Sequence, residues 1–414
     1  MTKIALLNIG SELLTGRTIN TNAASIAKLL RSRGYHLEST AVCHDTHAEI
    51  THWLNELMAR HEVVLVTGGL GPTKDDITKK VMLELFGGEM VVHEPTLRRI
   101  ESFLLMRNRR LLESNRLQAY VPSSCTVLDN FNGTAPGMAF QQGDRTVVSM
   151  PGVPFEMKHL MEDRVLALLE ERYPAVPMHT RMIRTAGVPE SRIAERMEDL
   201  ETELPEGLQV AYLPAFDGTK IELRLKSTDN DTANALLNAA QARIAERFSK
   251  YTYSLVDKNP DQLLAEYLLE NGVTMATAES CTGGAIAAKM VTHSGISSVF
   301  KGGVVAYMRE IKENVLGVES AEIDAHGIVS EAVAKSMAEG ARALLGSDIA
   351  VSITGIAEAA DDAGPADRPQ AWIGYADKNG TRAFHIKLFK QRKTNIEVAT
   401  NAVLIYALRI LARE

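Results

Sequence analysis

The sequence predicts an α/β protein with more than one domain, and three observations support this prediction. The chain has 414 residues, which is too long for one ordinary domain. A second alternation of strand-like and helix-like segments starts near residue 260, after a stretch with a different pattern. Such alternation is typical of parallel sheets with crossover helices. The first alternation comprises strand-like segments 3–9, 36–43 and 62–67 and helix-like segments 22–34 and 47–60.

Changes in this pattern place the domain boundaries. The first domain covers residues 1–172 and ends in a long helical stretch, and the Pro-rich segment 173–177 is typical of a linker. Residues 178–256 predict a small α+β domain, and residues 259–414 predict a third domain of α/β type. In the middle domain we expect strands at 181–187, 208–214 and 219–227 and helices at 189–200 and 231–248.

Composition restricts the class of protein. A hydrophobic fraction of 45% and a charged fraction of 23% are those of a globular protein, and no apolar run is long enough to span a membrane. Cys43, Cys125 and Cys281 are widely spaced and form neither a metal pattern nor a disulfide framework, so we expect a reducing, cytoplasmic location. A net charge of −7 argues against direct binding of nucleic acid.

Two clusters of polar residues follow predicted strands of the first domain and therefore belong at one edge of its sheet. The sequence of residues 67–76 is TGGLGPTKDD, in which backbone N–H groups of a glycine loop can cradle a phosphate. Carboxylates beside a phosphate require a divalent cation. We therefore expect a phosphate-ester or pyrophosphate substrate and a metal ion whose identity the sequence leaves open. The alternative is that the two aspartates cap a helix. The expected phosphate contacts are Gly68, Gly69, Gly71 and Thr73, and the expected metal ligands are Glu12, Asp75 and Asp76.

Three further segments of the first domain, at 114–116, 132–137 and 150–156, combine polar residues with glycine and proline. We expect Asn115, Asn132 and Thr134 to contact the substrate. The alternative is that these residues only shape turns.

In the third domain, Ser280 lies where a strand leads into a helix, within the sequence TAESCTGG at residues 277–284. Gly283 and Gly284 let the backbone approach a ligand closely, and a helix N-terminus favours negative charge. Serine with lysine is a known pairing of nucleophile and base. The alternative is an N-capped turn without chemistry. The other candidates follow or lie near predicted strand ends: Tyr307, Lys312 and Thr354.

Taken in order, these motifs resemble those of the CinA family (competence/damage-inducible proteins) over nearly the whole chain. The first domain is similar to the molybdopterin-binding fold of MoaB and MogA type proteins, which implies a three-layer α/β architecture. The third domain resembles the PncC type nicotinamide mononucleotide (NMN) deamidase. The segments that carry the resemblance are 10–22, 67–76, 114–116, 132–138, 150–157, 182–191, 210–214 and 277–284.

The resemblance implies a hydrolase of pyridine-nucleotide salvage. Its first domain would be a metal-dependent ADP-ribose pyrophosphatase, and its last would convert NMN to nicotinate mononucleotide and ammonia. Ser280 matches the nucleophile and Lys312 its base, while Tyr307 and Thr354 match positioning groups and Ser297 a substrate contact. The resemblance also implies a homodimer.

The sequence departs from the family pattern after Thr354, where Glu358, Asp361 and Asp362 replace a glycine-rich phosphate loop. These carboxylates would repel the phosphate of NMN, so we expect weak or absent deamidation. Smaller departures are Ser11 and Asn20 in the first motif. Two alternatives remain open, namely a pterin- or nucleotide-binding protein without turnover and an adaptor linked to competence or DNA damage.

Overall fold

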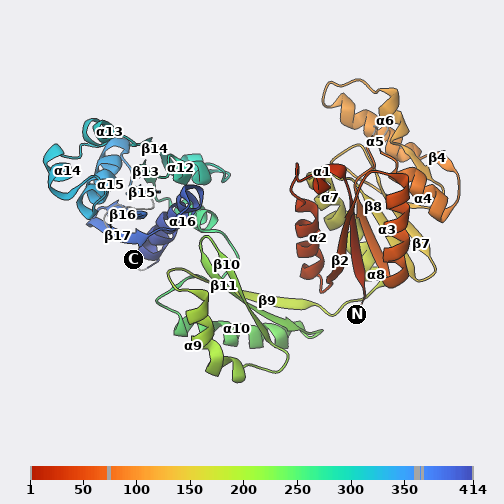
Figure 1. Cartoon of the computed structure of the whole chain (residues 1–414), viewed down its shortest axis with the longest axis horizontal. Coiled ribbons are helices and arrows are strands. Elements are labelled where there is room, and N and C mark those ends of the chain that lie inside the picture. Colours follow the sequence, from red (N-terminus) through yellow and green to blue (C-terminus); the bar gives the residue numbers. More distant parts are fainter. Residues whose placement is uncertain (1, 72–75, 359–363, 365–367, 413–414) are drawn as a thin grey trace. The chain divides into compact units, whose positions relative to one another are not determined.

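The computed structural model describes residues 2–71, 76–358, 364 and 368–412. Within these residues the strands form a six-stranded, a four-stranded and a five-stranded sheet and one two-stranded pair (Figure 1). The chain divides into two compact units, Met1–His179 with Leu225–Ala233 and Thr180–Arg224 with Asn234–Glu414. The prediction of a multidomain α/β protein is confirmed. No helix among the described residues is long and apolar enough to cross a membrane.

The six-stranded sheet of the N-terminal domain is mixed rather than wholly parallel. Four neighbouring strands, β2 (Leu37–Cys43), β1 (Ile4–Ile9), β3 (Val63–Thr67) and β8 (Arg145–Met150), run parallel. Beyond them, β7 (Gly137–Gln142) pairs antiparallel with β8 and the edge strand β6 (Thr126–Leu128) pairs antiparallel with β7, which the strand–helix alternation did not predict. The reason is a two-residue turn between β7 and β8, where Gly143 has a φ of 60°.

Helices cover both faces of this sheet and make the predicted three layers (Figure 1). Successive β1 side chains enter different cores, because side chains alternate along a strand. Ala5 and Leu7 pack with α3 (His47–Arg60) and α4 (Thr78–Phe86). Ile4 and Leu6 pack on the other face, against helices that include the predicted long helical stretch before residue 172. These helices are α2 (Thr21–Ser32), α7 (Pro154–Leu160), the π-helical turn η1 (Met161–Val165) and α8 (Leu166–Arg172).

The remaining short elements of this domain lie between β3 and β6 in the sequence. They are β4 (Met90–Val92), α5 (Glu94–Leu105), α6 (Glu113–Leu117) and β5 (Tyr120–Pro122), with β4 paired to β5. A single helical turn, α1 (Ser11–Leu14), follows β1.

The middle domain is the small α+β module that the sequence predicts. Its sheet has the order β10-β11-β9-β12, and β10 and β11 form an antiparallel hairpin. Both predicted helices are present, as α9 and α10. The bounds are β9 (Met178–Thr185), α9 (Glu190–Thr202), β10 (Gln209–Ala215), β11 (Gly218–Lys226), α10 (Asn230–Arg247) and β12 (Thr252–Ser254).

The C-terminal domain has a five-stranded sheet with β13 (Met275–Glu279) near its centre. β13 runs parallel to both neighbours, β14 (Phe300–Val305) and β15 (Ile349–Ile356). Beyond β15, the hairpin of β16 (Gln370–Asp377) and β17 (Gly380–Lys387) continues the sheet in antiparallel fashion.

Both faces of this second sheet are also covered by helices. One core joins the sheet to α11 (Pro260–Asn271), α12 (Ala285–Met290) and α16 (Arg392–Leu411). The other joins it to α14 (Ser320–His326) and α15 (Glu331–Leu345). β13 is therefore buried along its whole length, and its last residue immediately precedes Ser280. The short helices η2 (Ile296–Ser298) and α13 (Arg309–Asn314) lie on either side of β14 in the sequence.

Candidate functional site

The C-terminal domain brings Ser280 and Lys312 into direct contact. Lys312 donates a hydrogen bond from Nζ to Oγ of Ser280 at 3.0 Å, and a second one to the carbonyl oxygen of Ala306. Lys312 is fully buried and Ser280 is 8% exposed. Burial disfavours the charged ammonium and lowers the pKa of Lys312 to about 8. A lysine that is partly neutral near pH 8 can accept the proton of a serine hydroxyl.

The fold explains why these two residues meet although they are 32 positions apart. Ser280 follows the carboxyl end of β13, and the segment leading to Lys312 follows the carboxyl end of the adjacent parallel strand β14. The carboxyl ends of neighbouring parallel strands open on the same edge of a sheet, where ligands bind in α/β folds. Lys312 then lies in α13, one helical turn after its N-cap Met308.

A pocket of about 260 Å³ lies beside the Ser280–Lys312 pair. Thr354 and Tyr307, both predicted from the sequence, line it. Thr354 donates its hydroxyl to the carbonyl oxygen of Ile328 at 2.8 Å, and Tyr307 is 53% exposed at the mouth. The complete lining is Ser280, Cys281, Tyr307, Ile328, Val329, Thr354, Gly355, Ile356, Ala357, Glu358 and Arg392.

Arg392 is a pocket residue that the sequence analysis missed. It is the first residue of α16, and its Nη2 donates to the hydroxyl of Tyr307 at 2.6 Å. The only sequence signal was the basic segment 390–393, which lies far along the chain from the serine motif. Glu358 of the predicted acidic segment lines the same pocket, whereas Asp361 and Asp362 fall outside the described residues. The described pocket wall thus carries one cation and one carboxylate.

Asn395 fixes the backbone on which these two charges are placed. It is fully buried in the first turn of α16, and its amide nitrogen donates to the carbonyl oxygens of Ala357 and Phe389, each at 2.7 Å. Its side-chain oxygen accepts from the N–H of Phe389 at 2.7 Å. One side chain therefore joins the segment that ends in Glu358 to the segment that leads into Arg392.

The predicted glycines and Ser297 lie outside the lining of this pocket. Gly283 and Gly284 have φ angles of 62° and 98°, in the left-handed region that glycine adopts without strain. They shape the turn into α12, and Ser297 is exposed in η2. Whether these three residues contact a substrate stays a prediction.

The N-terminus of α12 is already occupied by a carboxylate of the protein. Glu279, which is 1% exposed, accepts hydrogen bonds from the hydroxyl of Thr282 and from the N–H groups of Gly284, Ile286 and Ala287. The negative charge expected at this helix start is therefore the side chain of Glu279. These helix N–H groups are not free to bind a substrate anion.

The motifs of the N-terminal domain also converge at the carboxyl ends of its parallel strands. A Cβ atom added to Gly68 would lie 2.2 Å from the carbonyl oxygen of Ile9, and one added to Gly152 would lie 3.3 Å from Cα of Gly68. Asn22 donates to the carbonyl oxygen of Gly152 at 2.7 Å. Motifs that are distant in the sequence therefore lie side by side, as the strand pattern predicts.

His44 and Asp45, which directly follow β2, also lie at this edge. The sequence analysis did not select either residue. The N–H of Ser11 donates to Asp45 at 2.8 Å, and the hydroxyl of Ser11 lies 3.1 Å from Nδ1 of His44. Asn20, the other departure from the family pattern, caps α2 by accepting from the N–H of Ala23 at 3.1 Å.

The glycine loop differs from the prediction in where its helix begins. Under the alternative, the two aspartates would cap a helix, but α4 begins at Thr78 and its N-cap residue is Ile77. Thr78 donates its hydroxyl to the carbonyl oxygen of Gly68 at 3.1 Å. A Cβ atom on Gly71 would lie 2.6 Å from a carboxylate oxygen of Asp76, so this side chain lies against the loop. Thr73 and Asp75 fall outside the described residues.

The predicted substrate contacts of the later segments are held by local hydrogen bonds. Asn132 donates its N–H to the side chain of Asn130, which in turn donates to Glu156 at 2.7 Å. Asn115 accepts from the N–H of Leu112 at 3.2 Å and so supports its own helix. Thr134 is half-buried in the loop that follows Asn132. Burial raises the pKa of Glu156, a carboxyl group at this edge that the sequence analysis did not select.

The described residues do not by themselves provide a metal site. No three histidine, cysteine or acidic side chains among them lie close enough together to hold an ion. Glu12 is exposed on α1 and folds back toward Gly10, where a Cβ atom would meet its Oε1 at 2.5 Å. A metal ion held by Glu12, Asp75 and Asp76 stays a prediction, because Asp75 lies outside the described part.

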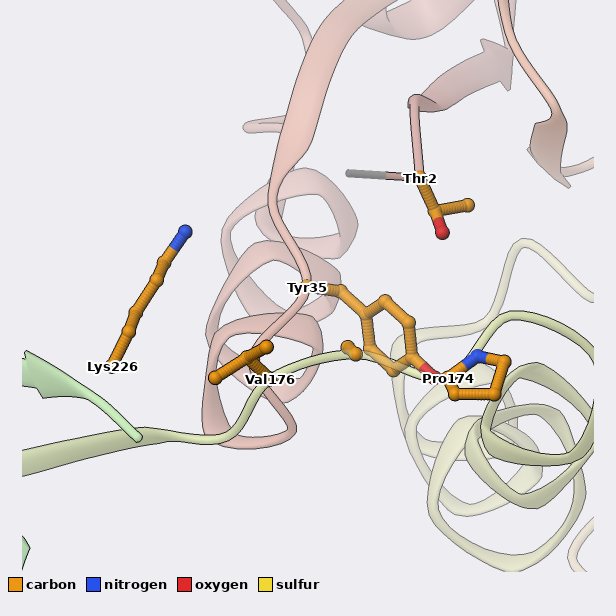
Figure 2. Close-up of a pocket in the computed structure, with 7 residues that line it drawn as sticks. Thr2, Tyr35, Pro174, Val176 and Lys226 are labelled. Carbon is orange, nitrogen blue, oxygen red and sulfur yellow. The ribbon is translucent and has the colours of Figure 1, made fainter. Parts of the chain in front are cut away.

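A second pocket of about 270 Å³ lies in the N-terminal unit, and none of its lining residues belongs to the predicted motifs (Figure 2). Figure 2 shows the rings of Tyr35 and Pro174 side by side, where the hydroxyl of Tyr35 donates to the carbonyl oxygen of Tyr173 at 2.9 Å. A Cβ atom on Gly34 would lie 2.2 Å from the carbonyl oxygen of Val176. This pocket results from the docking of the linker rather than from groups suited to catalysis.

Comparison with known proteins assigns the chain to a family. A CinA-like protein of Gemmatimonas aurantiaca is 38% identical over 386 residues, which are 92% of this chain and 90% of that protein. The chain belongs to the CinA family. A CinA-like protein of Salinibacter ruber is 36% identical over 99% of this chain and 100% of its own length.

Three family models match successive parts of this CinA-family chain. Residues 5–171 match the model described as "Probable molybdopterin binding domain", residues 180–254 the "Damage-inducible protein CinA KH domain", and residues 257–411 the "CinA C-terminal domain". The crystal structure of CinA from Thermoplasma acidophilum is 33% identical and covers 40% of this chain and 98% of its own, with a TM-score of 0.37. The resemblance inferred from the motifs is confirmed.

The KH match concerns a fold that often binds nucleic acids through a Gly-x-x-Gly loop. Residues 180–254 contain three glycines, Gly187, Gly207 and Gly218, and none has another glycine three residues later. The sequence of this domain therefore lacks the loop with which KH modules clamp a nucleic-acid backbone.

Proposed function

We propose that the C-terminal domain is a serine–lysine amidohydrolase that converts NMN to nicotinate mononucleotide and ammonia. One observation carries the proposal: a fully buried Lys312 lies 3.0 Å from Oγ of Ser280, beside a pocket large enough for part of a nucleotide. A surface lysine would remain charged and could not act as a base near neutral pH, whereas burial provides the neutral form.

The contact between Ser280 and Lys312 defines the path of the proton in the proposed reaction. Lys312 accepts the hydroxyl proton as Oγ of Ser280 attacks the carboxamide carbon. The resulting ammonium of Lys312 gives that proton to the departing nitrogen, which leaves as ammonia and yields an ester on Ser280. Lys312, neutral again, activates a water molecule that hydrolyses the ester and frees the carboxylate product.

The pocket wall supports a pyridine nucleotide as substrate. Ile328 and Val329 offer an apolar surface to an aromatic ring, and Arg392 offers a guanidinium to a phosphate group. Glu358 lines the same pocket and opposes a phosphate, so we expect a high Michaelis constant for NMN rather than a slow chemical step.

The N-terminal domain is the second candidate for an activity, as a metal-dependent ADP-ribose pyrophosphatase. The support is that Gly68, Asp76, Asn22 and Gly152 come together at one sheet edge, as a phosphate site requires. When bound, a divalent ion would neutralise the pyrophosphate charge. The described residues alone do not form the site of this ion.

One assay distinguishes these activities from the alternatives. The purified protein is incubated separately with NMN and with ADP-ribose, each with and without a panel of divalent ions, while ammonia and AMP are measured. Ammonia release that needs no metal supports the amidohydrolase, and metal-dependent AMP release supports the pyrophosphatase. Tight nucleotide binding without either product indicates a binding protein, and salt-dependent retention of DNA indicates the adaptor.

A further inference from the structure

Glu279 is a buried carboxylate whose recorded partners are neutral donors. Its Oε2 accepts from the hydroxyl of Thr282 at 2.8 Å and from the N–H groups of Gly284 and Ile286, at 3.1 and 3.0 Å. Its Oε1 accepts from the N–H of Ala287 at 2.8 Å. A carboxylate is costly to bury, and here four donors and the positive end of a helix compensate for the loss of water.

This arrangement is unusual as a helix cap. The N-cap residue of α12, Gly284, has no side chain to accept a hydrogen bond, so the cap comes from Glu279, five residues earlier on the preceding strand. The segment between them is short and contains Ser280. By accepting from Thr282 within this segment and from Gly284 at its end, Glu279 fixes the path of the chain that carries the nucleophile.

The same turn contains two backbone N–H groups that do not donate to Glu279, those of Cys281 and Thr282. No backbone carbonyl among the described residues accepts from the N–H groups of Cys281 and Thr282, whereas their neighbours Ser280 and Gly283 donate to the carbonyl oxygens of Ile353 and Ser280. Cys281 is 6% exposed and Thr282 is 4% exposed. Cys281 lines the pocket beside Ser280, so an N–H group of this turn that no backbone carbonyl engages is placed to donate to an acceptor on the ligand.

We propose that Glu279 is a positioning residue: it holds the turn at residues 280–284 so that the N–H groups of Cys281 and Thr282 stabilise the negative charge that develops on the substrate carbonyl oxygen. The inference rests on the proposed amidohydrolase function, because it assumes that Ser280 is the nucleophile. Since Glu279 occupies the N–H groups of α12, the residue directly after the nucleophile is the source of the oxyanion site.

A fluorophosphonate probe tests this proposal without the natural substrate. Oγ of Ser280 attacks the phosphorus, an O–P bond forms, fluoride leaves, and the hydroxyl proton passes to Lys312. The phosphoryl oxygen becomes more negative on the way, as the carbonyl oxygen of an amide would. We expect Glu279→Gln to slow labelling of the folded full-length protein about 100-fold, because the amide nitrogen of glutamine cannot accept from the N–H groups and the turn shifts.

Asp348 provides a matched control at the opposite end of the same sheet. It too is a carboxylate that accepts from a backbone N–H and a threonine hydroxyl, those of Thr274, at 2.8 and 2.6 Å. We expect Asp348→Asn to lower the melting temperature while leaving the labelling rate of the folded protein unchanged. Equal labelling rates for Glu279→Gln and Asp348→Asn would overturn the proposal and leave Glu279 with a structural role only.

A milder pair of variants keeps the test decisive if Glu279→Gln does not fold. Thr282→Val removes one donor to Glu279 and should slow labelling about tenfold, whereas Thr282→Ser keeps the hydroxyl and should restore the rate. The pH midpoint of labelling should stay near 8 in all these variants, because the pKa of Lys312 depends on its own burial. A shifted midpoint, or no difference between the valine and serine variants, contradicts the proposal.

The parent protein separates failure of this inference from failure of the proposed function. If Ser280 of the parent does not react with the probe and Ser280→Ala loses no labelling, the nucleophile assignment itself is wrong. If Ser280 reacts and Glu279→Gln reacts as fast, only the positioning role of Glu279 is wrong.

Discussion

The two candidate sites of this protein lie at the same kind of place but are built differently. In the C-terminal domain, two side chains that follow adjacent parallel strands touch, and both are buried. In the N-terminal domain, backbone and glycine contacts bring the loops together, while Glu12 and Asp76 each lie against their own loop. The first site has its reactive groups in place before a ligand arrives. In the second, no three of the described acidic side chains lie close enough together to hold an ion.

This difference shows how burial, rather than residue type, sets reactivity. Lys312 and Lys335 have the same side chain, but Lys335 forms a surface ion pair with Glu331 while Lys312 is fully buried. The pKa of Lys312 falls to about 8 because its ammonium is desolvated. Variants of the two sites test whether the C-terminal pair acts as one preformed unit and whether the N-terminal site depends on a metal ion.

Removal of the reactive pair should have the largest effect. Ser280→Ala and Lys312→Ala should each lower NMN turnover by about 10³-fold or more, and the double variant should cost little beyond either one, because the two residues act as a unit. Ammonia release measures the rate. Ser298→Ala, at an exposed residue, and Lys335→Ala, at a half-buried one, both lie outside the pocket lining and are the controls. Turnover of Ser280→Ala near the parent rate contradicts the assignment.

Asp75→Asn should affect only the N-terminal site. We expect metal-dependent hydrolysis of ADP-ribose to fall about 100-fold, with NMN turnover unchanged. Loss of residues that only hydrogen-bond to a metal ligand already lowers activity by about 10- to 100-fold, and loss of the ligand itself should cost at least as much. AMP release over a metal titration measures the effect. Asp144→Asn, in the exposed turn between β7 and β8, is the control. An unaltered metal dependence in Asp75→Asn would exclude this residue as a ligand.

The pH dependence of NMN turnover reports on Lys312. The neutral amine is the active form, so kcat/KM should level off above a midpoint of about 8 and fall about tenfold per pH unit below it. The pKa of Lys312 is about 8 in the folded protein and 10.5 in the unfolded chain, so unfolding between these pH values takes up a proton. The contribution of Lys312 to the free energy of unfolding therefore rises with pH over that range. A rate that is constant from pH 6.5 to 9 would show that Lys312 is not the base.

The two charges at the pocket mouth should have smaller effects of opposite sign. Glu358→Gln should lower the Michaelis constant for NMN about fivefold, and Arg392→Gln should raise it, since solvent screens both charges. The turnover number should change little in either variant. Glu339→Gln, on α15 outside the pocket lining, is the matched control. If Glu358→Gln leaves the Michaelis constant unchanged, this carboxylate does not face the phosphate.

The sequence by itself determined the α/β character of the chain, most of its strand–helix alternation and the candidate pair of Ser280 and Lys312. The alternation of strand and helix signals placed Ser280 and the glycine loop at the ends of buried strands, because the carboxyl ends of parallel strands share one edge. Residue chemistry then selected serine and lysine as a pair, although nothing in the spacing of 32 residues shows that they touch.

Only the tertiary structure decided which groups surround that pair. Arg392 reaches the pocket because α16 packs across the sheet and Asn395 ties its first turn to the segment at Ala357, a contact between residues 38 positions apart. In the sequence, Glu279 is indistinguishable from the other residues of its strand. In the structure, its buried side chain accepts hydrogen bonds from the first N–H groups of α12 and caps that helix. Short-range patterns report on local structure, whereas contacts across a sheet edge depend on how distant segments pack. For that reason the sequence selected Ser280 and Lys312 as candidate residues, and the packing determined their environment.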